Sequence, residues 1–138
     1  YFCDFDRNYA IEKADDLSRR AYDTLWRATE AGLSTAQPGR PCRDLFQSMQ
    51  NVISEMDDQG GEVGRYGHGL GMQLTEQPSH AVFDDTVLEE NMVITLEPSL
   101  NYGDGRIMVH EENLVVQNGK PRLLSVRATP ELPIIGVS

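Results

Sequence analysis

The hydrophobic pattern changes its period once along the chain, and this change limits the folds that the chain can adopt. From Tyr9 to about Gly32, small and apolar residues recur at steps of three and four between charged ones, which predicts an amphipathic helix that Gly32 ends. A Pro-Gly loop at residues 38–41 leads into a second helix with an apolar face between residues 45 and 56, followed by Gly60-Gly61. The helical period then disappears, so we expect strands in the rest of the chain.

Strand-like patterns fill this second part. Residues 92–96 (MVITL) form a short run rich in β-branched side chains, and residues 106–116 are predicted to be one longer strand. Asn118-Gly119 is typical of a tight hairpin turn into residues 123–126, and the tail at 130–138 is predicted to be extended. Helices followed by several strands predict an α+β fold, in which the helices cover an antiparallel sheet.

Length and charge narrow the class of protein. With 138 residues, 39% of them hydrophobic, the chain can form one domain with a core, or part of one. The formal net charge of −10 argues against nucleic acid and anionic membrane surfaces as partners, because both carry the same sign of charge. A peptide or small-molecule substrate fits this charge better.

The ends of the chain and its cysteines bear on location. The sequence contains no apolar run of about 18 residues and no signal-like start, so we predict neither a membrane span nor a secretory leader. Cys3 and Cys42 lack CxxC spacing, which argues against a thiolate metal site and favours a reducing, cytoplasmic compartment. The chain starts at Tyr1 in what reads as mid-strand, so we expect it to be the C-terminal piece of a longer protein.

Four polar residues stand where the pattern predicts burial: Asp4, His68, Glu97 and Glu111. Each is costly to bury without a partner, and carboxylates brought together repel one another unless cations neutralise them. One imidazole with several carboxylates suits Mn²⁺, Fe²⁺, Co²⁺ or Zn²⁺. From the residues alone two interpretations remain. Either these residues bind metal, or Asp4 and Glu111 are ordinary edge-strand charges and His68 is a turn residue.

Three ordered motifs separate these interpretations: GHGLG at 67–71, NMVITLEPSLNYG at 91–103 and HEENLVV at 110–116. In order and separation they resemble the signatures of the pita-bread metallopeptidase family, which includes methionine aminopeptidase, aminopeptidase P, prolidase and creatinase. CDFDR at 3–7 resembles the family's strand segment ending in Asp-x-x-Arg, and STAQPGRPCRDLF at 34–46 resembles the step between its first two helices. The resemblance covers nearly the whole chain.

The resemblance implies a fold and a metal site. The fold would be the pita-bread fold, a curved antiparallel sheet covered by helices, with residues 1–138 as the C-terminal portion of a single catalytic domain. Asp4 and Glu111 would bridge two divalent metal ions, and His68 and Glu97 would be ligands of one of them. The flanking glycines would let the His68 imidazole and the substrate approach the backbone closely.

The resemblance also implies an activity, metal-assisted hydrolysis by an Xaa-Pro-type peptidase, with manganese among the suitable metals. Two ions about 3.5 to 4 Å apart share a water and lower its pKa towards roughly 7, which makes a metal-bound hydroxide available. His68 and Glu97 would be the catalytic residues, and Glu97 would take the proton of this water and pass it to the leaving nitrogen. The partners implied are a peptide or small molecule and, as is common in the family, a second copy of the chain in a homodimer.

Neighbouring polar residues are given lesser roles. Strand alternation and the family pattern both favour Glu111 over Glu112, which should face the other way and be solvated or salt-bridged. Asp6 is expected to stay away from the metals, and His110 to point away from them. His80 is expected at the surface.

Several positions depart from the family pattern. A further ligand Asp of the family would lie upstream of Tyr1. Thr75 replaces a second histidine and can donate one hydrogen bond but carry no charge, so we assign it a substrate-positioning role. Ser99 replaces a glycine and Val109 an arginine, while Arg106 is out of register.

These departures leave two alternatives to the peptidase. One is a non-peptidase member acting on a small polar molecule, as a creatinase-like C–N hydrolase or a metal-dependent lyase. The other is an inactive binding module of the same fold.

Overall fold

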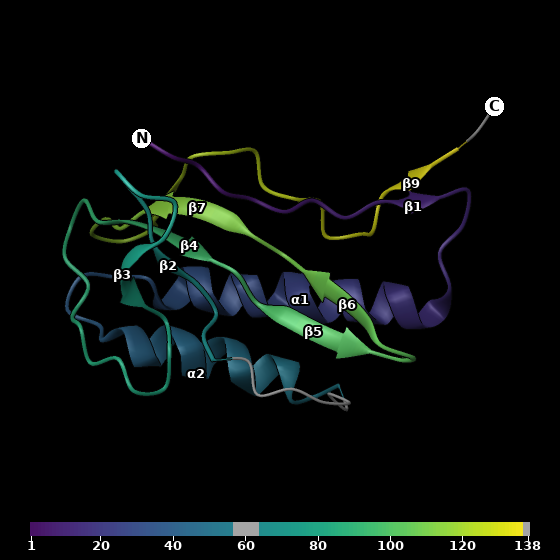
Figure 1. Ribbon diagram of the computed structural model, residues 1–138, viewed down its shortest axis with the longest axis horizontal. Helices are drawn as coiled ribbons and strands as arrows, with labels where there is room; N and C mark the ends of the chain where they lie inside the picture. The colour runs from purple at the N-terminus through teal and green to yellow at the C-terminus, as the bar shows by residue number, and fades with distance from the viewer. Residues whose placement is uncertain (57–63, 137–138) are drawn as a thin grey trace.

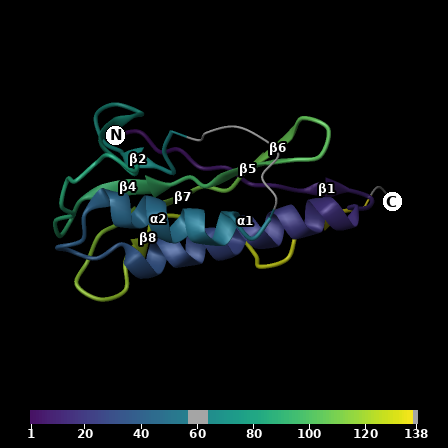
Figure 2. The ribbon, with the colours of Figure 1, turned by 90° about the horizontal axis from the view of Figure 1, so that it is seen from below.

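The computed structural model describes residues 1–56 and 64–136 (Figure 1). Two helices, α1 (Asp16–Thr35) and α2 (Cys42–Ile53), pack against each other and form one layer against the strands (Figure 2). The strands are β1 (Ala10–Ile11), β2 (His68–Gly69), β3 (Glu76–Ser79), β4 (Val93–Leu96), β5 (Ser99–Tyr102), β6 (Arg106–Val109), β7 (Glu112–Val115), β8 (Arg122–Leu123) and β9 (Ile134–Ile135). This arrangement confirms the predicted α+β class. Among the described residues, no helix is long and apolar enough to cross a membrane.

Helix α1 begins later than predicted. The Asp15 side chain accepts a hydrogen bond from the Ser18 backbone N–H at 2.6 Å and caps the helix. The residues before this cap are not helical, and Ala10–Ile11 pairs in parallel with the distant strand β9. The predicted helical start at Tyr9 was therefore wrong, because a cap and a long-range strand pairing override the apolar spacing. The predicted extended tail contains strand β9 at Ile134–Ile135, and residues 137–138 of that prediction lie outside the described residues.

Helix α1 also continues past Gly32, contrary to the prediction that this glycine ends it. A Cβ on Gly32 would lie 3.0 Å from both Leu96 Cδ1 and Met49 Sδ. The glycine thus allows α1 to approach α2 and β4 closely. The predicted stop of the second helix at Gly60-Gly61 lies outside the described residues, and α2 itself ends at Ile53.

The main sheet has five strands in the order β3-β2-β4-β7-β8, and every neighbouring pair is antiparallel. The predicted strand at 92–96 corresponds to β4, and the predicted Asn118-Gly119 turn joins β7 to β8. The predicted single strand at 106–116 was wrong, because it divides into β6 and β7. Strand β6 pairs with β5 in a separate hairpin, which was not predicted.

The register across this division is unbroken. Leu96 pairs with Glu112 on one side of it and Ser99 pairs with Val109 on the other, so two residues of each strand, 97–98 and 110–111, face each other between the pairs. Pro98 has no N–H to donate, although the His110 N–H still donates to the Pro98 carbonyl at 3.1 Å. The proline thus interrupts the ladder without shifting it.

Side chains alternate across the ladder and give the sheet two different faces. Ile94, Leu96 and Leu114 are fully buried in the core with residues of α1 and α2. Burying a leucine in this way stabilises the fold by roughly 1.5 to 3 kcal/mol. Residues 95, 97, 111 and 113 therefore face away from the helices, towards the side along which the N-terminal segment runs (Figures 1 and 2).

Candidate metal centre

Glu97 and Glu111 meet across the interruption of the ladder. They lie opposite each other in the register set by the pairs on either side, so their side chains leave the sheet on the same face. Like charges directly opposite each other destabilise a sheet. Two facing glutamates therefore indicate a site built to hold positive charge.

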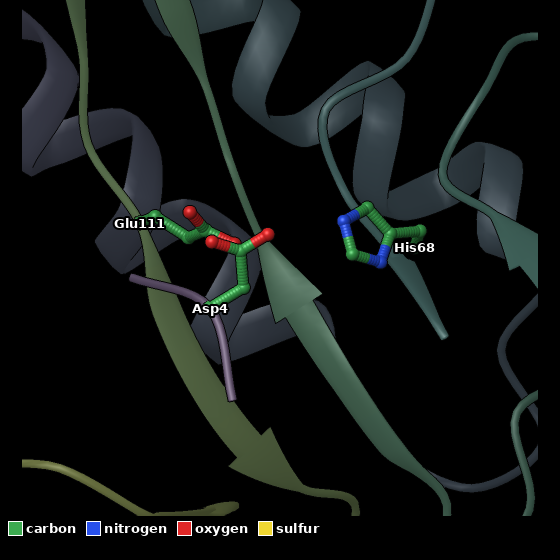
Figure 3. Close-up of side chains that lie close together, drawn as sticks. All are labelled: Asp4, His68 and Glu111. Carbon is green, nitrogen blue, oxygen red and sulfur yellow. The ribbon is translucent and has the colours of Figure 1, made fainter. Parts of the chain in front are cut away.

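Two further side chains join this face from other parts of the chain. One ligand atom from each of Asp4, His68 and Glu111 lies within 4.8 Å of the others. In Figure 3 the carboxylates of Asp4 and Glu111 point towards each other, with the His68 ring facing them. Asp4 comes from the N-terminal segment. This segment is held by a hydrogen bond of 3.0 Å from the Phe2 N–H to the Gly71 carbonyl. The three residues thus converge from three separate segments.

His68 has a defined orientation and tautomer. Its ring is buried, and Nδ1 lies 2.9 Å from the Gly69 carbonyl oxygen, which can only accept a hydrogen bond. In the neutral imidazole Nδ1 therefore carries the proton, and Nε2 carries the lone pair. Nε2 lies 3.6 Å from Glu97 Oε2, which places Glu97 beside the cluster. Such a histidine is ready to donate its lone pair to a metal.

The glycines around His68 are required by the packing of neighbouring strands. A Cβ at Gly67 would lie 2.3 Å from the Thr95 carbonyl oxygen, and φ there is 137°. A Cβ at Gly69 would lie 2.1 Å from the Gln77 carbonyl oxygen. We expected the His68 imidazole and the substrate to approach these glycines, whereas in the structure the backbones of β3 and β4 approach them.

The electrostatics of the site favour a bound cation. Glu111 is 2% exposed, and its Oε1 has no hydrogen-bond partner within the described part of the chain. Burial, and then the neighbouring charges of Glu97 and Asp4, raise the pKa of the Glu111 carboxyl to about 8. Burial also raises the pKa of Glu97. A divalent cation would relieve this repulsion and satisfy the unpaired oxygen, so the residues fit the metal that the resemblance implies.

Other predicted residues lie outside the cluster. Thr75 is exposed in the segment between β2 and β3, and Asp6 is exposed beside Asp4. His110 faces the helices, as expected, with its ring 5.1 Å from that of Tyr22. The expectation that His80 lies at the surface was wrong, because it is fully buried next to Gly67, where burial lowers its pKa to about 4.

The partners of Glu112, behind the cluster, were not predicted from the sequence. Glu112 is fully buried on the opposite face of the sheet and forms salt bridges with Arg7 at 2.9 Å and Arg127 at 3.1 Å. Of the two roles predicted for Glu112, solvated or salt-bridged, the second is therefore confirmed. The sequence feature that could have indicated a role for Arg7 was its place in the CDFDR segment, three residues after Asp4. No sequence signal pointed to Arg127.

Comparisons with known proteins identify the family of the chain. The model of metallopeptidase family M24 matches residues 1–118. An Xaa-Pro dipeptidase from Pyrococcus furiosus is 28% identical over 124 residues, which are 89% of this chain and 36% of the relative. The chain thus spans about a third of the length of the curated relatives it matches.

Solved structures share the fold. The dipeptidase PepE from Mycobacterium ulcerans superposes with a TM-score of 0.88 at 23% identity, covering 98% of this chain and 36% of that one. The N-terminal domain of FACT complex subunit SPT16 from chickpea superposes with a TM-score of 0.82 at 17% identity, covering 93% and 33%. The pita-bread fold implied by the resemblance is confirmed. With the family model matching 118 of the 138 residues, the chain belongs to metallopeptidase family M24.

Proposed function

We propose that the protein containing this chain is a divalent-metal-dependent hydrolase that cleaves Xaa-Pro peptides. The observation that supports this most is the convergence of ligand atoms from Asp4, His68 and Glu111 within 4.8 Å, with Glu97 opposite Glu111. The name of the Pyrococcus furiosus relative, Xaa-Pro dipeptidase, supports the substrate class. In this proposal residues 1–138 are the C-terminal portion of a single catalytic domain.

The site in this proposal would take two divalent ions. The carboxylates of Asp4, Glu97 and Glu111 and the Nε2 atom of His68 would hold them. A donor set of one imidazole nitrogen and several carboxylate oxygens suits Mn²⁺, Fe²⁺, Co²⁺ or Zn²⁺ better than Ca²⁺. When bound, the ions supply Lewis-acid activation of the attacking water and of the scissile carbonyl.

The chain's own residues provide proton transfer and orientation. Glu97 is half-buried, and burial raises its pKa, so its carboxylate is a stronger base than an exposed one. It would take a proton from the attacking water and return it to the leaving nitrogen. The hydrogen bond from Nδ1 of His68 to Gly69 keeps the ring oriented. Thr75 would donate one hydrogen bond to the substrate.

Two substituted positions favour a second candidate, a non-peptidase member acting on a small polar molecule. Ser99 and Val109 pair directly across β5 and β6, on the same face as Glu97 and Glu111 and two residues further along. The face beside the candidate metal site therefore carries a hydroxyl and an apolar side chain. A changed pair there would alter the substrate while the ligands stay in place.

A third candidate is a binding module without turnover. Its support is the fold shared with a domain of a FACT complex subunit. The unpaired buried oxygen of Glu111 argues against it, because a pure binder gains nothing from facing buried carboxylates.

The test is proline release from a panel of Xaa-Pro dipeptides by the full-length protein with Mn²⁺. Glu97→Gln removes the proposed base, and Glu90→Gln, at an exposed glutamate before β4, is the matched control. We expect turnover by the wild type and the control, and a loss in Glu97→Gln. Metal binding without release of proline would refute the peptidase and favour the second candidate.

A further inference from the structure

The buried carboxylate of Glu112 lies directly behind the candidate metal centre. It is fully enclosed and accepts hydrogen bonds from four groups. They are Arg7 Nη2 at 2.9 Å, Arg127 Nη1 at 3.1 Å, Ser125 Oγ at 3.1 Å and the Ala128 N–H at 3.0 Å. The function proposed above uses none of these residues. A fully satisfied buried charge of this kind fixes the backbone that carries it.

Arg7 connects this carboxylate to the two segments that carry acidic ligands. Its Nη1 donates to the Glu111 carbonyl at 2.8 Å, while Nη2 donates to Glu112 and to the Val126 carbonyl at 2.7 Å. Arg7 itself lies three residues after Asp4. One planar guanidinium thus holds the backbone of Glu111 at a set distance from the segment of Asp4.

Arg127 attaches the same carboxylate to helix α1. Its Nε donates to Glu30 at 3.1 Å, its Nη2 donates to the Trp26 carbonyl at 3.2 Å, and its guanidinium lies 4.9 Å from the centre of the Trp26 ring. The side chain of Glu112 is therefore held from both sides, by the N-terminal segment and by the helix. These contacts therefore also fix the backbone of Glu111, which directly precedes Glu112.

We propose that Arg7 is a positioning residue for the metal centre, which sets the spacing of the Asp4 and Glu111 carboxylates through its contacts with Glu111 and Glu112. The inference rests on the metal site of the proposed function. The geometry requires the forked donors of arginine, because its two terminal nitrogen atoms donate to five acceptors that lie in different directions. A lysine would keep the charge but could not reproduce these contacts.

The test measures metal binding separately from catalysis, in the full-length protein. Mn²⁺ affinity is measured by calorimetry, the ligand geometry by the visible absorption of bound Co²⁺, and folding by thermal unfolding of the metal-free protein. The variants are Arg7→Lys and the milder Ser125→Ala, which removes one donor to Glu112. Arg106→Lys is the matched control, because Arg106 forms an ion pair with Asp15 at 2.8 Å away from the cluster.

We expect Arg7→Lys to weaken Mn²⁺ binding by about 10- to 100-fold, as for other groups that orient metal ligands, and to change the Co²⁺ spectrum. Ser125→Ala should weaken binding less, and the control should leave both readouts unchanged. If Arg7→Lys does not fold, an altered Co²⁺ spectrum in Ser125→Ala supports the inference and an unaltered one overturns it. Lower thermal stability with unchanged affinity and spectrum would overturn the positioning role alone. Failure of the wild type to bind either metal would overturn the metal centre, and this inference with it.

Discussion

Removing the charge of Glu111 should make the metal-free protein more stable at neutral pH. The Glu111 carboxyl has its pKa raised from 4.5 to about 8, first by burial and then by Glu97 and Asp4. Below pH 4.5 it is protonated in both the folded and unfolded states. Between these values the unfolded chain ionises while the folded one keeps its proton, so unfolding releases a proton and stability falls as pH rises. Above about pH 8 the loss is complete.

The gap between these pKa values sets the size of the effect. At about 1.4 kcal/mol per pH unit, this gap lowers the free energy of unfolding by about 5 kcal/mol between pH 4.5 and 8, as an upper bound. Burial also raises the pKa of Glu97, and its carboxylate shares the repulsion with Glu111, so we expect about 2 to 3 kcal/mol in practice. Glu111→Gln should remove most of this pH dependence. The isosteric amide has no charge to bury.

The assay is urea unfolding of the full-length protein with a chelator, at pH 5, 6, 7 and 8. The free energy of unfolding of Glu111→Gln should fall less between pH 5 and 8 than that of the wild type, and Glu90→Gln should follow the wild type. Equal slopes for all three proteins would refute the idea that Glu111 is buried against other carboxylates. Adding Mn²⁺ should reverse the order at pH 8, because only the wild type has the full set of ligands.

Three further predictions follow from single sites. Glu97→Gln should lower kcat by about 10²- to 10⁴-fold with a smaller change in KM, and steady-state kinetics showing only a raised KM would contradict its role as base. Gly67→Ala should lower the free energy of unfolding by more than about 2 kcal/mol, since its Cβ would meet the Thr95 carbonyl, whereas Gly64→Ala, with open space around it, should not destabilise. Asp15→Ala should lower the thermal midpoint at pH 7. Hydrogen bonding to the Ser18 backbone and to Arg106 lowers the Asp15 pKa to about 2, so this contribution is full above pH 3.8 and disappears as pH falls towards 2, and an unchanged midpoint would contradict the cap.

The sequence predicted the presence of the main elements better than their limits. Both helices and the strand at 92–96 could be recognised, because local periodicity determines them. The start of α1 depends on the Asp15 cap and on the pairing of Ala10–Ile11 with β9, which lies more than a hundred residues away. No local pattern contains that pairing.

The hairpin of β5 and β6 could have been recognised but was not. Gly103, Asp104 and Gly105 all have positive φ values, at 42°, 44° and 73°, and such a Gly-Asp-Gly run is typical of a tight turn. The interruption at Pro98 was also visible, since a proline cannot donate to the ladder. That Glu97 and Glu111 face each other as a result could not be predicted, because it depends on the register between the paired strands.

The candidate ligands could be named from motif resemblance, whereas their surroundings could not. Family pattern and strand alternation separated His68 and Glu111 from His110 and Glu112. In the structure the first two lie in the cluster, and the other two face away from it. The burial of His80 and the contacts of Arg7 and Arg127 with Glu112 depend on residues distant in sequence. From the sequence alone, such side chains cannot be distinguished from surface charges or loop residues, because their contact partners are distant in the sequence.

The most direct test of the metal centre is anomalous X-ray diffraction at the manganese edge from crystals of the full-length protein grown with Mn²⁺. We expect anomalous peaks at about 2.0 to 2.3 Å from His68 Nε2 and from the carboxylate oxygens of Asp4, Glu97 and Glu111. Crystals that contain manganese elsewhere, with no peak between these four side chains, would contradict it.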